Sequence, residues 1–328
     1  MLKIKNSTIL VGLSLSEHDQ NLILSAANLA KRTQSKLVLA HAILPFQAYA
    51  YAGEGAFYPM ASYENSFREL SEVMGMEKLE ELKSSISSFG DQGVDISIRV
   101  VHNDPALGLG QLAKEVAASL LICGFRPERV QHDFFGMSTA LLLMSEAPCP
   151  VLSLPLDREF RFDGSIAFAD DLQEETLAAL QTTCEFLQEI DAHKLYHVHI
   201  NNISERDVQS MTEMVKSGML LGKIPSNPDF DKQYYIDKTT DLISENMSQR
   251  FHNLPESLQQ NVQYQTEVGF GSPAKKLKAV LEDIKAELVV FGTHKFFDRS
   301  SWSFGKMPYH SMVSMNCGVL IIPEKEST

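Results

Sequence analysis

Residues 105–124 read PALGLGQLAKEVAASLLICG, and residues 273–292 read PAKKLKAVLEDIKAELVVFG. Both stretches begin with proline, carry apolar residues at matching positions and end on a glycine after an apolar run. The offset of 168 residues (273 minus 105) also relates two further pairs: Cys149 with Cys317, and Pro155 with Pro323. An offset held without a gap over about fifty residues indicates one structural unit written twice.

Each copy alternates short apolar runs with amphipathic segments, as expected for strands that alternate with helices. The expected strands are 7–13, 36–43, 94–101, 119–123 and 151–154 in the first copy, and 165–169, 194–200, 262–268, 287–291 and 319–322 in the second. Unbroken apolar runs are typical of parallel sheets covered on both faces. The sequence therefore predicts an α/β fold with two tandem, doubly wound, five-stranded parallel-sheet domains of Rossmann-like type, at residues 1–157 and 163–328.

Two details of these copies predict local structure. Asp104-Pro105 and Ser272-Pro273 each place a capping residue before proline, so both should begin a helix with a side-chain cap. The junction DREFRFDGS at 157–165 is short and reads as polar, so we expect the two halves to pack tightly together. The connections after the second strands, 46–93 and 202–261, are long, and the spacing from the second strand to the third is ten residues greater in the second half.

Composition excludes several classes of protein. The net charge is -13 and both halves are acidic, so nucleic acid and anionic membranes are unfavourable partners. The four cysteines form no C-x-x-C pair, which indicates neither a disulfide framework nor a zinc site. No apolar run reaches membrane-spanning length and the start has no signal-peptide pattern, so a cytoplasmic location is expected.

Catalytic and metal-binding patterns are weak. His197 and His199 face the same side of an expected strand, but no acidic or cysteine ligand lies near them in sequence, so structural histidines are favoured over a metal site. No G-x-S-x-G motif occurs, so no catalytic nucleophile is assigned. The G-x-G-x-x-A match at 108–113 lies inside an expected helix and not at its start, so a dinucleotide site is disfavoured.

The loops after the first and fourth strands are the informative ones, because ligands of doubly wound sheets bind where the strand order reverses. In the second half the chain reads Gly292-Thr-His-Lys295 and later Gly305-Lys306-Met307. In the first half it reads Gly124-Phe-Arg-Pro127 and later Gly136. A helix that begins at Gly305 would offer unpaired N–H groups to an anion.

These features resemble the universal stress protein family, and two copies resemble its tandem members. The resemblance rests on the order of elements, the Asp/Ser-Pro pair before the third helix, the strand ending in Gly-Thr-His and the final Cys-x-Val-Leu-x-x-Pro. It implies an adenine-nucleotide-hydrolase-like fold, pairing of domains through their fifth strands, and a nucleotide loop of the form Gly-x2-Gly-x9-Gly-(Ser/Thr) after strand four. It also implies an aspartate at the end of strand one that supports adenosine.

The resemblance carries over to the second half better than to the first. Gly292 and Gly305 match the first and third glycines, whereas Lys295 and Lys306 replace the second glycine and the Ser/Thr. Asp171, or its neighbour Asp170, matches the aspartate. The candidate cofactor-binding residues are Asp171, Gly292, His294, Lys295, Gly305, Lys306 and Met307. In the first half Ser14 stands in the aspartate position and Pro127 in that of the second glycine.

Two functions stay open at this point. One is a stress-response protein of this family that binds ATP or AMP in its second half, with Mg²⁺ as an accompanying ion and at most weak ATP hydrolysis. The other is an interaction module without nucleotide, acting on an unknown protein partner through surfaces such as 46–64 and 202–235. An ATP-using enzyme is disfavoured, because neither half has an S-G-G-x-D-S-type loop. The resemblance further implies a pseudo-dimer within one chain, and a homodimer of that unit is compatible with it.

Overall fold

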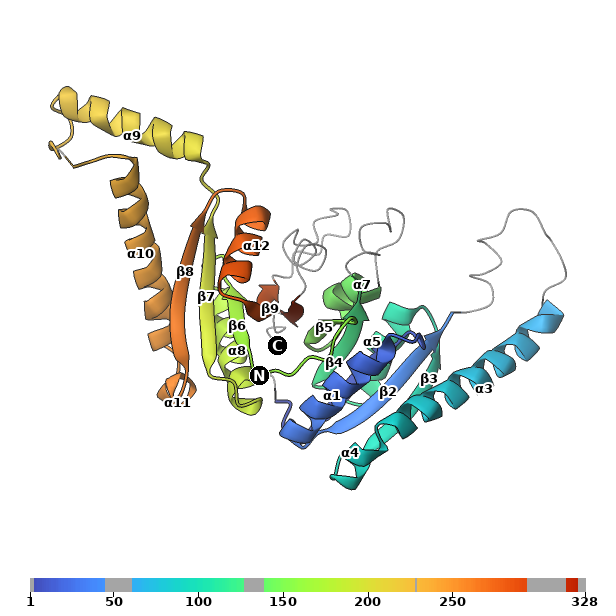
Figure 1. Ribbon diagram of the computed structural model, residues 1–328. Coiled ribbons are helices and arrows are strands. Elements are labelled where there is room, and N and C mark those ends of the chain that lie inside the picture. The colour runs from blue at the N-terminus through green and yellow to red at the C-terminus, as the bar shows by residue number, and fades with distance from the viewer. Residues whose placement is uncertain (1–2, 45–60, 127–138, 228, 294–316, 324–328) are drawn as a thin grey trace.

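The computed structural model describes residues 3–44, 61–126, 139–227, 229–293 and 317–323. Its strands form a single sheet in the order β3-β2-β1-β4-β5-β10-β9-β6-β7-β8 (Figure 1). The strands are β1 (Thr8–Leu13), β2 (Lys36–Ile43), β3 (Ile96–His102), β4 (Leu120–Phe125), β5 (Val151–Pro155), β6 (Ser165–Ala169), β7 (Lys194–Asn201), β8 (Gln263–Phe270), β9 (Ala286–Thr293) and β10 (Gly318–Pro323). Each half contributes five strands in the same doubly wound order, which confirms the predicted fold class.

Helices cover both faces of this sheet. They are α1 (Asp19–Thr33), α3 (Ala61–Ser85), α4 (Ser87–Asp91), α5 (Pro105–Glu115), α7 (Thr139–Glu146), α8 (Thr176–Glu189), α9 (Glu205–Leu220), α10 (Lys232–His252), α11 (Glu256–Gln259) and α12 (Pro273–Asp283). Leu22 of α1 and Leu180 of α8 belong to one buried cluster that runs through both halves. Leu109 of α5 and Leu281 of α12 belong to the cluster on the opposite face. Both hydrophobic cores therefore extend across the junction between the halves.

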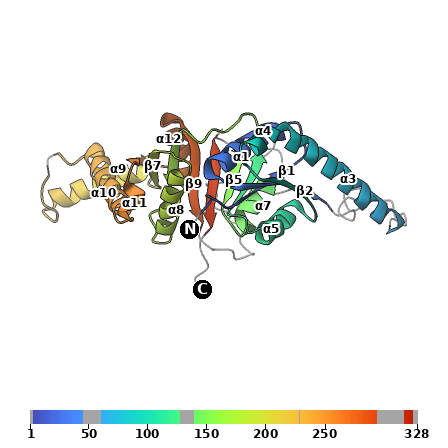
Figure 2. The same ribbon diagram turned by 90° about the horizontal axis from the view of Figure 1, so that it is seen from below.

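The halves meet through β5 and β10, which pair antiparallel, whereas every other neighbouring pair is parallel. Val151 pairs with Ile321 and Ser153 pairs with Val319. Ser153 and Ile321 occupy equivalent positions in the two copies, and so do Val151 and Val319. Each copy therefore contacts the other through the same positions, as in a two-fold interface. Figure 2 shows the red β10 next to β5 at the centre of the molecule. The expected fifth-strand pairing therefore occurs within one chain.

The junction between the halves differs from its expected polar character. Phe160 and Phe162 are both buried, and their rings meet edge to face with centroids 4.7 Å apart. The backbone N–H of Phe160 donates to the hydroxyl of Ser25 on α1 over 2.7 Å. In the sequence these two phenylalanines stand among charged residues, so their contribution to the hydrophobic core was not expected. The close packing of the halves that we expected is present, and the two aromatic side chains of the junction contribute to it.

The two expected helix caps have different outcomes. Asp104 accepts hydrogen bonds from the N–H groups of Ala106 and Leu107 at the start of α5, as predicted. Ser272 precedes Pro273 at the start of α12, but its side chain makes no capping hydrogen bond, so that part of the prediction is wrong. Ser272 is exposed, so water can satisfy the N–H groups of the first turn there.

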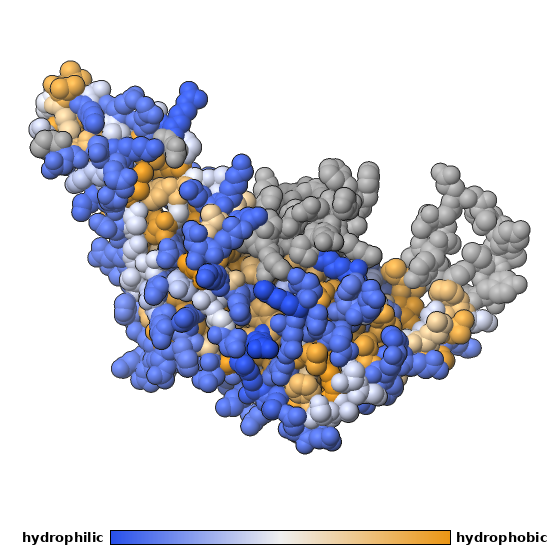
Figure 3. Space-filling model, in the orientation of Figure 1, coloured by the Kyte–Doolittle hydropathy of each residue, from blue (hydrophilic) through white to orange (hydrophobic). Residues whose placement is uncertain are grey.

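The long connections form helices that extend beyond the sheet. Figure 1 shows α9 projecting away from the body of the second half, with α10 returning along β8. Large apolar side chains are exposed on and after α9, namely Met214, Leu220, Leu221 and Ile224. Figure 3 shows apolar residues gathered at the far end of this projection. Among the described helices, none combines the length and apolar character needed to cross a membrane.

A substitution at the centre of the molecule should test how much the junction contributes. Leu320 in the middle of β10 is 0% exposed and belongs to the cluster shared by both halves. Leu320→Ala should lower the free energy of unfolding in urea by about 2–5 kcal/mol, because a buried cavity remains. Leu221→Ala, at a side chain that is 71% exposed, is the matched control and should change it by less than about 0.5 kcal/mol. Equal effects of the two changes would contradict a shared core.

Candidate functional site

Each half has a point where the strand order reverses, at the carboxyl ends of its two central strands. In the first half β1 lies beside β4, and Gly12 is in register with Cys123. In the second half β6 lies beside β9, and Ala169 is in register with Phe291. The carboxyl ends of these strands therefore lie side by side, which is the usual location of ligands in doubly wound sheets.

The structure describes two of the predicted binding residues. Asp171 is exposed just after β6, and its Oδ1 accepts a hydrogen bond from the N–H of Gln173 over 3.1 Å. Gly292 lies in β9, where a Cβ would lie only 2.7 Å from the Cβ of Ala179 on α8. This glycine is thus needed for helix packing whether or not a ligand binds. The other predicted residues lie outside the described residues: His294, Lys295, Gly305, Lys306 and Met307.

The sequence left open which of two aspartates matches the family position, and the structure gives them different roles. Asp170 is buried, unlike Asp171. Its Oδ1 accepts from the hydroxyl of Thr176 over 2.6 Å and from the N–H of Leu172 over 2.8 Å. Its Oδ2 lies 2.8 Å from Nε2 of His197. Asp170 is therefore committed to contacts within the protein, whereas Asp171 is exposed.

Arg250 near the end of α10 completes this polar cluster. Its Nε lies 3.3 Å from Oδ2 of Asp170 as an ion pair, although the N–H is not aligned well enough for a hydrogen bond to any described group. Its Nη2 donates to the carbonyl of Gln173 over 2.7 Å and to the hydroxyl of Thr176 over 2.9 Å. One planar guanidinium thus fastens the loop after β6 to the long connection of the second half.

His197 lies between Asp170 and Tyr264. Its Nδ1 is 2.8 Å from the hydroxyl of Tyr264, which is also 2.9 Å from the carbonyl of Met247. A neutral imidazole fits this arrangement if Nε2–H donates to Asp170 and Nδ1 accepts from the Tyr264 hydroxyl. The Met247 carbonyl lies inside α10, where the helix backbone supplies a hydrogen-bond donor. This carbonyl therefore does not need a hydrogen bond from the Tyr264 hydroxyl. The cluster then holds one carboxylate and one guanidinium, and no net charge is buried.

The pKa directions agree with this proton arrangement. Burial lowers the pKa of His197 and outweighs the hydrogen bond and charge of Asp170, which act to raise it. Burial acts to raise the pKa of Asp170, but the hydrogen bonds from His197 and Thr176 lower it below its usual value. Asp170 is therefore ionised and His197 neutral near neutral pH.

Of the two histidines that were weighed as metal ligands, His197 contacts the side chains of Asp170 and Tyr264, and His199 contacts the backbone. Nδ1 of His199 lies 2.8 Å from the carbonyl of Asp170. Its repeat partner His41 makes the same contact in the first half, with Nδ1 2.8 Å from the carbonyl of Leu13. Both residues tie the second strand of their half to the end of the first strand. This matched geometry supports the structural interpretation of these histidines.

The first half contains a cavity of about 940 Å³ at the equivalent position. Asp19 at the start of α1 lines it and accepts from the hydroxyl of Ser14 over 3.1 Å and from the N–H of Ser16 over 3.1 Å. Arg126, after β4, donates to the hydroxyl of Ser16 over 3.1 Å. Burial raises the pKa of Asp19 above its usual value. The sequence missed Asp19, because a carboxylate was sought only at position 14.

A hydroxyl–carboxylate bond ties the loop after the first strand to the next helix in both halves, but the partners are exchanged. In the first half the loop supplies the hydroxyl of Ser14 and the helix supplies Asp19. In the second half the loop supplies Asp170 and the helix supplies Thr176. The two copies have kept the contact, with the carboxylate on the helix in the first half and on the loop in the second half.

The fold defines a tandem α/β protein with a candidate ligand site at each switch point. Residues 5–155 match the model of the universal stress protein family. The first half of the chain therefore belongs to the universal stress protein family, and the second half repeats its fold.

Solved structures agree with this assignment of the fold. A universal stress protein from Archaeoglobus fulgidus DSM 4304 is 13% identical, with a TM-score of 0.66 over 100% of both chains. A protein of unknown function from Pseudomonas aeruginosa PAO1 is 13% identical, with a TM-score of 0.56 over 98% of this chain and 94% of that chain. At this identity the likeness concerns the fold alone. No curated protein matches the chain.

The buried cluster predicts a pH dependence of stability. The pKa of His197 is lowered from its ordinary value of 6.5 in the folded protein, so as pH falls the unfolded chain takes up a proton first. The pKa of Asp170 is likewise lowered from 3.8, so its protonation also favours the unfolded chain at lower pH. The free energy of unfolding should therefore fall from about pH 6.5 downward, as urea titrations at several pH values would measure. His197→Gln should flatten the upper part of this decline, whereas exposed His18→Gln should not. A decline unchanged by His197→Gln would contradict the assignment.

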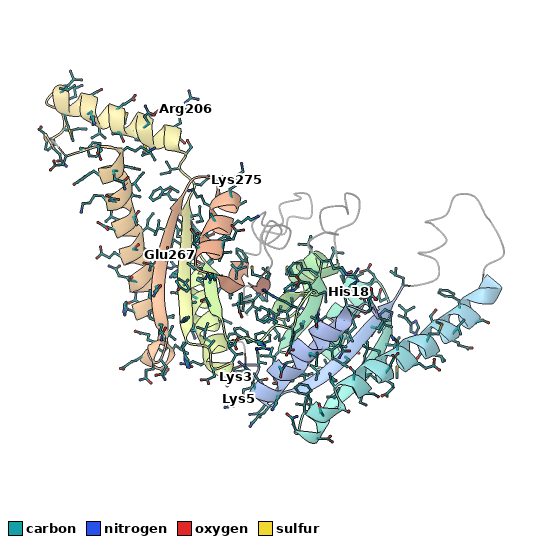
Figure 4. The ribbon with its side chains drawn as sticks, in the orientation of Figure 1. Lys3, Lys5, His18, Arg206, Glu267 and Lys275 are labelled. Atoms are coloured by element: carbon teal, nitrogen blue, oxygen red, sulfur yellow. The ribbon has the colours of Figure 1, made fainter. Side chains whose placement is uncertain are left out.

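The ion pair predicts strong coupling between Asp170 and Arg250. Arg250→Met should destabilise the protein by about 3–5 kcal/mol, because it leaves a buried carboxylate without its cation. Adding Asp170→Asn should restore part of that loss, so the double variant should be more stable than additivity predicts. Arg206→Met, at an exposed arginine of α9 (Figure 4), is the control and should have little effect. Additive effects in urea unfolding would refute the coupling.

Proposed function

We propose that this protein is a universal stress protein-type stress-response protein whose second half binds an adenine nucleotide, ATP or AMP. The observation that carries the proposal is the position of Asp171. It is exposed at the carboxyl end of β6, which lies next to β9. Gly292 is near the end of β9, and the predicted phosphate-binding residues follow it in the sequence. A carboxylate at this point can accept hydrogen bonds from ribose hydroxyl groups.

Local positive charge would have to hold the phosphates, since the whole chain carries a net charge of -13. Lys275 lies on the first turn of α12 at the same edge of the sheet (Figure 4). In the proposal Lys295 and Lys306 join it, and N–H groups from Gly305 onward bind the anion. An accompanying Mg²⁺ would neutralise further phosphate charge. No residue is assigned a catalytic role, so hydrolysis of ATP would be weak at most.

The polar cluster around Asp170 supports this site by shaping its backbone. Arg250 binds the carbonyls of Leu172 and Gln173 and so fixes the loop that begins with Asp171. A fixed loop lowers the entropic cost of binding, because the carboxylate is already held near its position in the complex. The long connection that carries Arg250 thus acts as a brace for the proposed site.

The second candidate is an interaction module without nucleotide. The observation that favours it is the exposure of Met214, Leu220 and Leu221 on and after α9, within the surface 202–235. Exposed apolar side chains that gather in one place often mark a contact with another protein. The two candidates differ in a simple measurement, because only the first requires nucleotide binding.

Calorimetric titration with ATP, ADP and AMP, with and without Mg²⁺, tests the proposal. At least one nucleotide should bind, and Asp171→Asn should weaken binding about tenfold or more through loss of charged hydrogen bonds. Asp191→Asn, at an exposed aspartate beyond the opposite end of α8, is the matched control and should leave binding unchanged. Substitution of Gly292 is unsuitable, since any Cβ there meets Ala179.

The same titration separates the alternatives. Binding that is insensitive to Asp171→Asn but weakened by Asp19→Asn would place the nucleotide in the cavity of the first half and contradict the proposed location. Absence of binding by all three nucleotides would contradict the nucleotide function and favour the interaction module.

A further inference from the structure

A second cavity lies at the opposite edge of the sheet, near the amino ends of its strands. It has a volume of about 410 Å³. Its walls come from the segment before β1, from the last turns of α8 and from the start of α11, so both halves contribute. The lining residues that matter here are Lys3, Lys5, Gln181, Glu185, Glu189 and Leu258. Figure 4 shows Lys3 and Lys5 next to each other at this edge.

Glu185 is the unusual group in this cavity. The residue is only 8% exposed, although glutamate is rarely so buried without a partner. Its Oε1 accepts a hydrogen bond from the side chain of Gln181 over 2.9 Å. Its Oε2 is buried and has no hydrogen-bond partner in the part of the chain that the structure describes. A buried carboxylate oxygen without a donor is costly, so a ligand that supplies one would be favoured.

Glu189 lies one turn further along α8. Its Oε2 accepts from the N–H of Ile4 over 2.6 Å and from the N–H of Lys5 over 3.1 Å. Burial raises its pKa, and the nearby charge of Glu185 acts in the same direction. Oε2 of Glu189 is thus occupied by the backbone of the first half, whereas Oε2 of Glu185 is buried without a hydrogen-bond partner among the described residues.

The charges in this cavity are separated in space. Glu185 is buried, whereas Lys3 and Lys5 are exposed at the rim. A phosphate group would meet two glutamates, and a simple cation would meet two lysines on its way in. Within the described residues no group of three or more potential metal ligands occurs, so metal coordination is not supported there. The complementary ligand carries one positive and one negative group.

We propose that this cavity binds a small zwitterion of the amino-acid class. Its ammonium group would donate to the carboxylate of Glu185, and its carboxylate would face Lys3 and Lys5. Leu258 supplies an apolar wall for a short side chain. Because the lining residues come from both halves, the bound molecule would strengthen the contact between them. The site is separate from the proposed nucleotide site at the carboxyl edge.

Thermal-shift and calorimetric titrations of the full chain with glycine, L-alanine and L-leucine test this site. At least one of the three should bind and raise the melting temperature by mass action. Propionate lacks the ammonium group and ethylamine lacks the carboxylate, so neither should bind comparably. Glu185→Gln should weaken binding tenfold or more, because it removes the charge while keeping the size of the side chain. Glu174→Gln, at an exposed glutamate before α8, is the matched control.

The outcomes are distinct. No binding by any of the three zwitterions to the wild-type chain would overturn the proposal. If Glu185→Gln were then also more stable than the wild type, Glu185 would be identified as a carboxylate that is merely unpaired. Equal binding of ethylamine and L-alanine would overturn the assigned ligand class. Zwitterion binding that survives Asp171→Asn but not Glu185→Gln would support the site independently of any nucleotide.

Discussion

The antiparallel contact between β5 and β10 is the constraint on which the rest of the structure depends. A five-stranded half would expose its fifth strand as an edge with unpaired N–H and C=O groups. Here each half covers the edge of the other, and the residues that pair are buried and, apart from Ser153, apolar, such as Leu152 with Leu320. The reciprocal register makes one chain the equivalent of a two-fold dimer. Both hydrophobic clusters then continue through the junction.

Duplication gave the two halves the same architecture, but not the same chemistry at the switch point. In the first half Asp19 faces a cavity together with Ser14 and Ser16. In the second half Asp170 is enclosed by Thr176, His197 and Arg250. Arg250 belongs to the long connection after the second strand, which in this half has become a brace for the strand-end loop. The exposed carboxylate after β6 is the next residue, Asp171.

The local and periodic features could be read before the structure was known. The alternation of apolar runs, the cap at Asp104 and the fifth-strand pairing implied by the family resemblance all agree with the observed fold. Two expectations were wrong for identifiable reasons: the charged junction hid the buried rings of Phe160 and Phe162, and exposed Ser272 makes no cap. The predicted loop from His294 to Met307 lies outside the described residues and stays a prediction.

The sequence by itself determined the repeat and the fold class, because these follow from periodicity and from residues close together in the chain, and it predicted the edge of the sheet where ligands would bind. Only the tertiary structure decided which aspartate is enclosed, that His197 is neutral beside it, and that Glu185 faces a cavity built from both halves. Arg250 reaches Asp170 across the fold from a distant helix, and Ile4 reaches Glu189 from the other half. Burial and hydrogen bonding between distant segments set the charge of a side chain, and neither has a signature in local sequence.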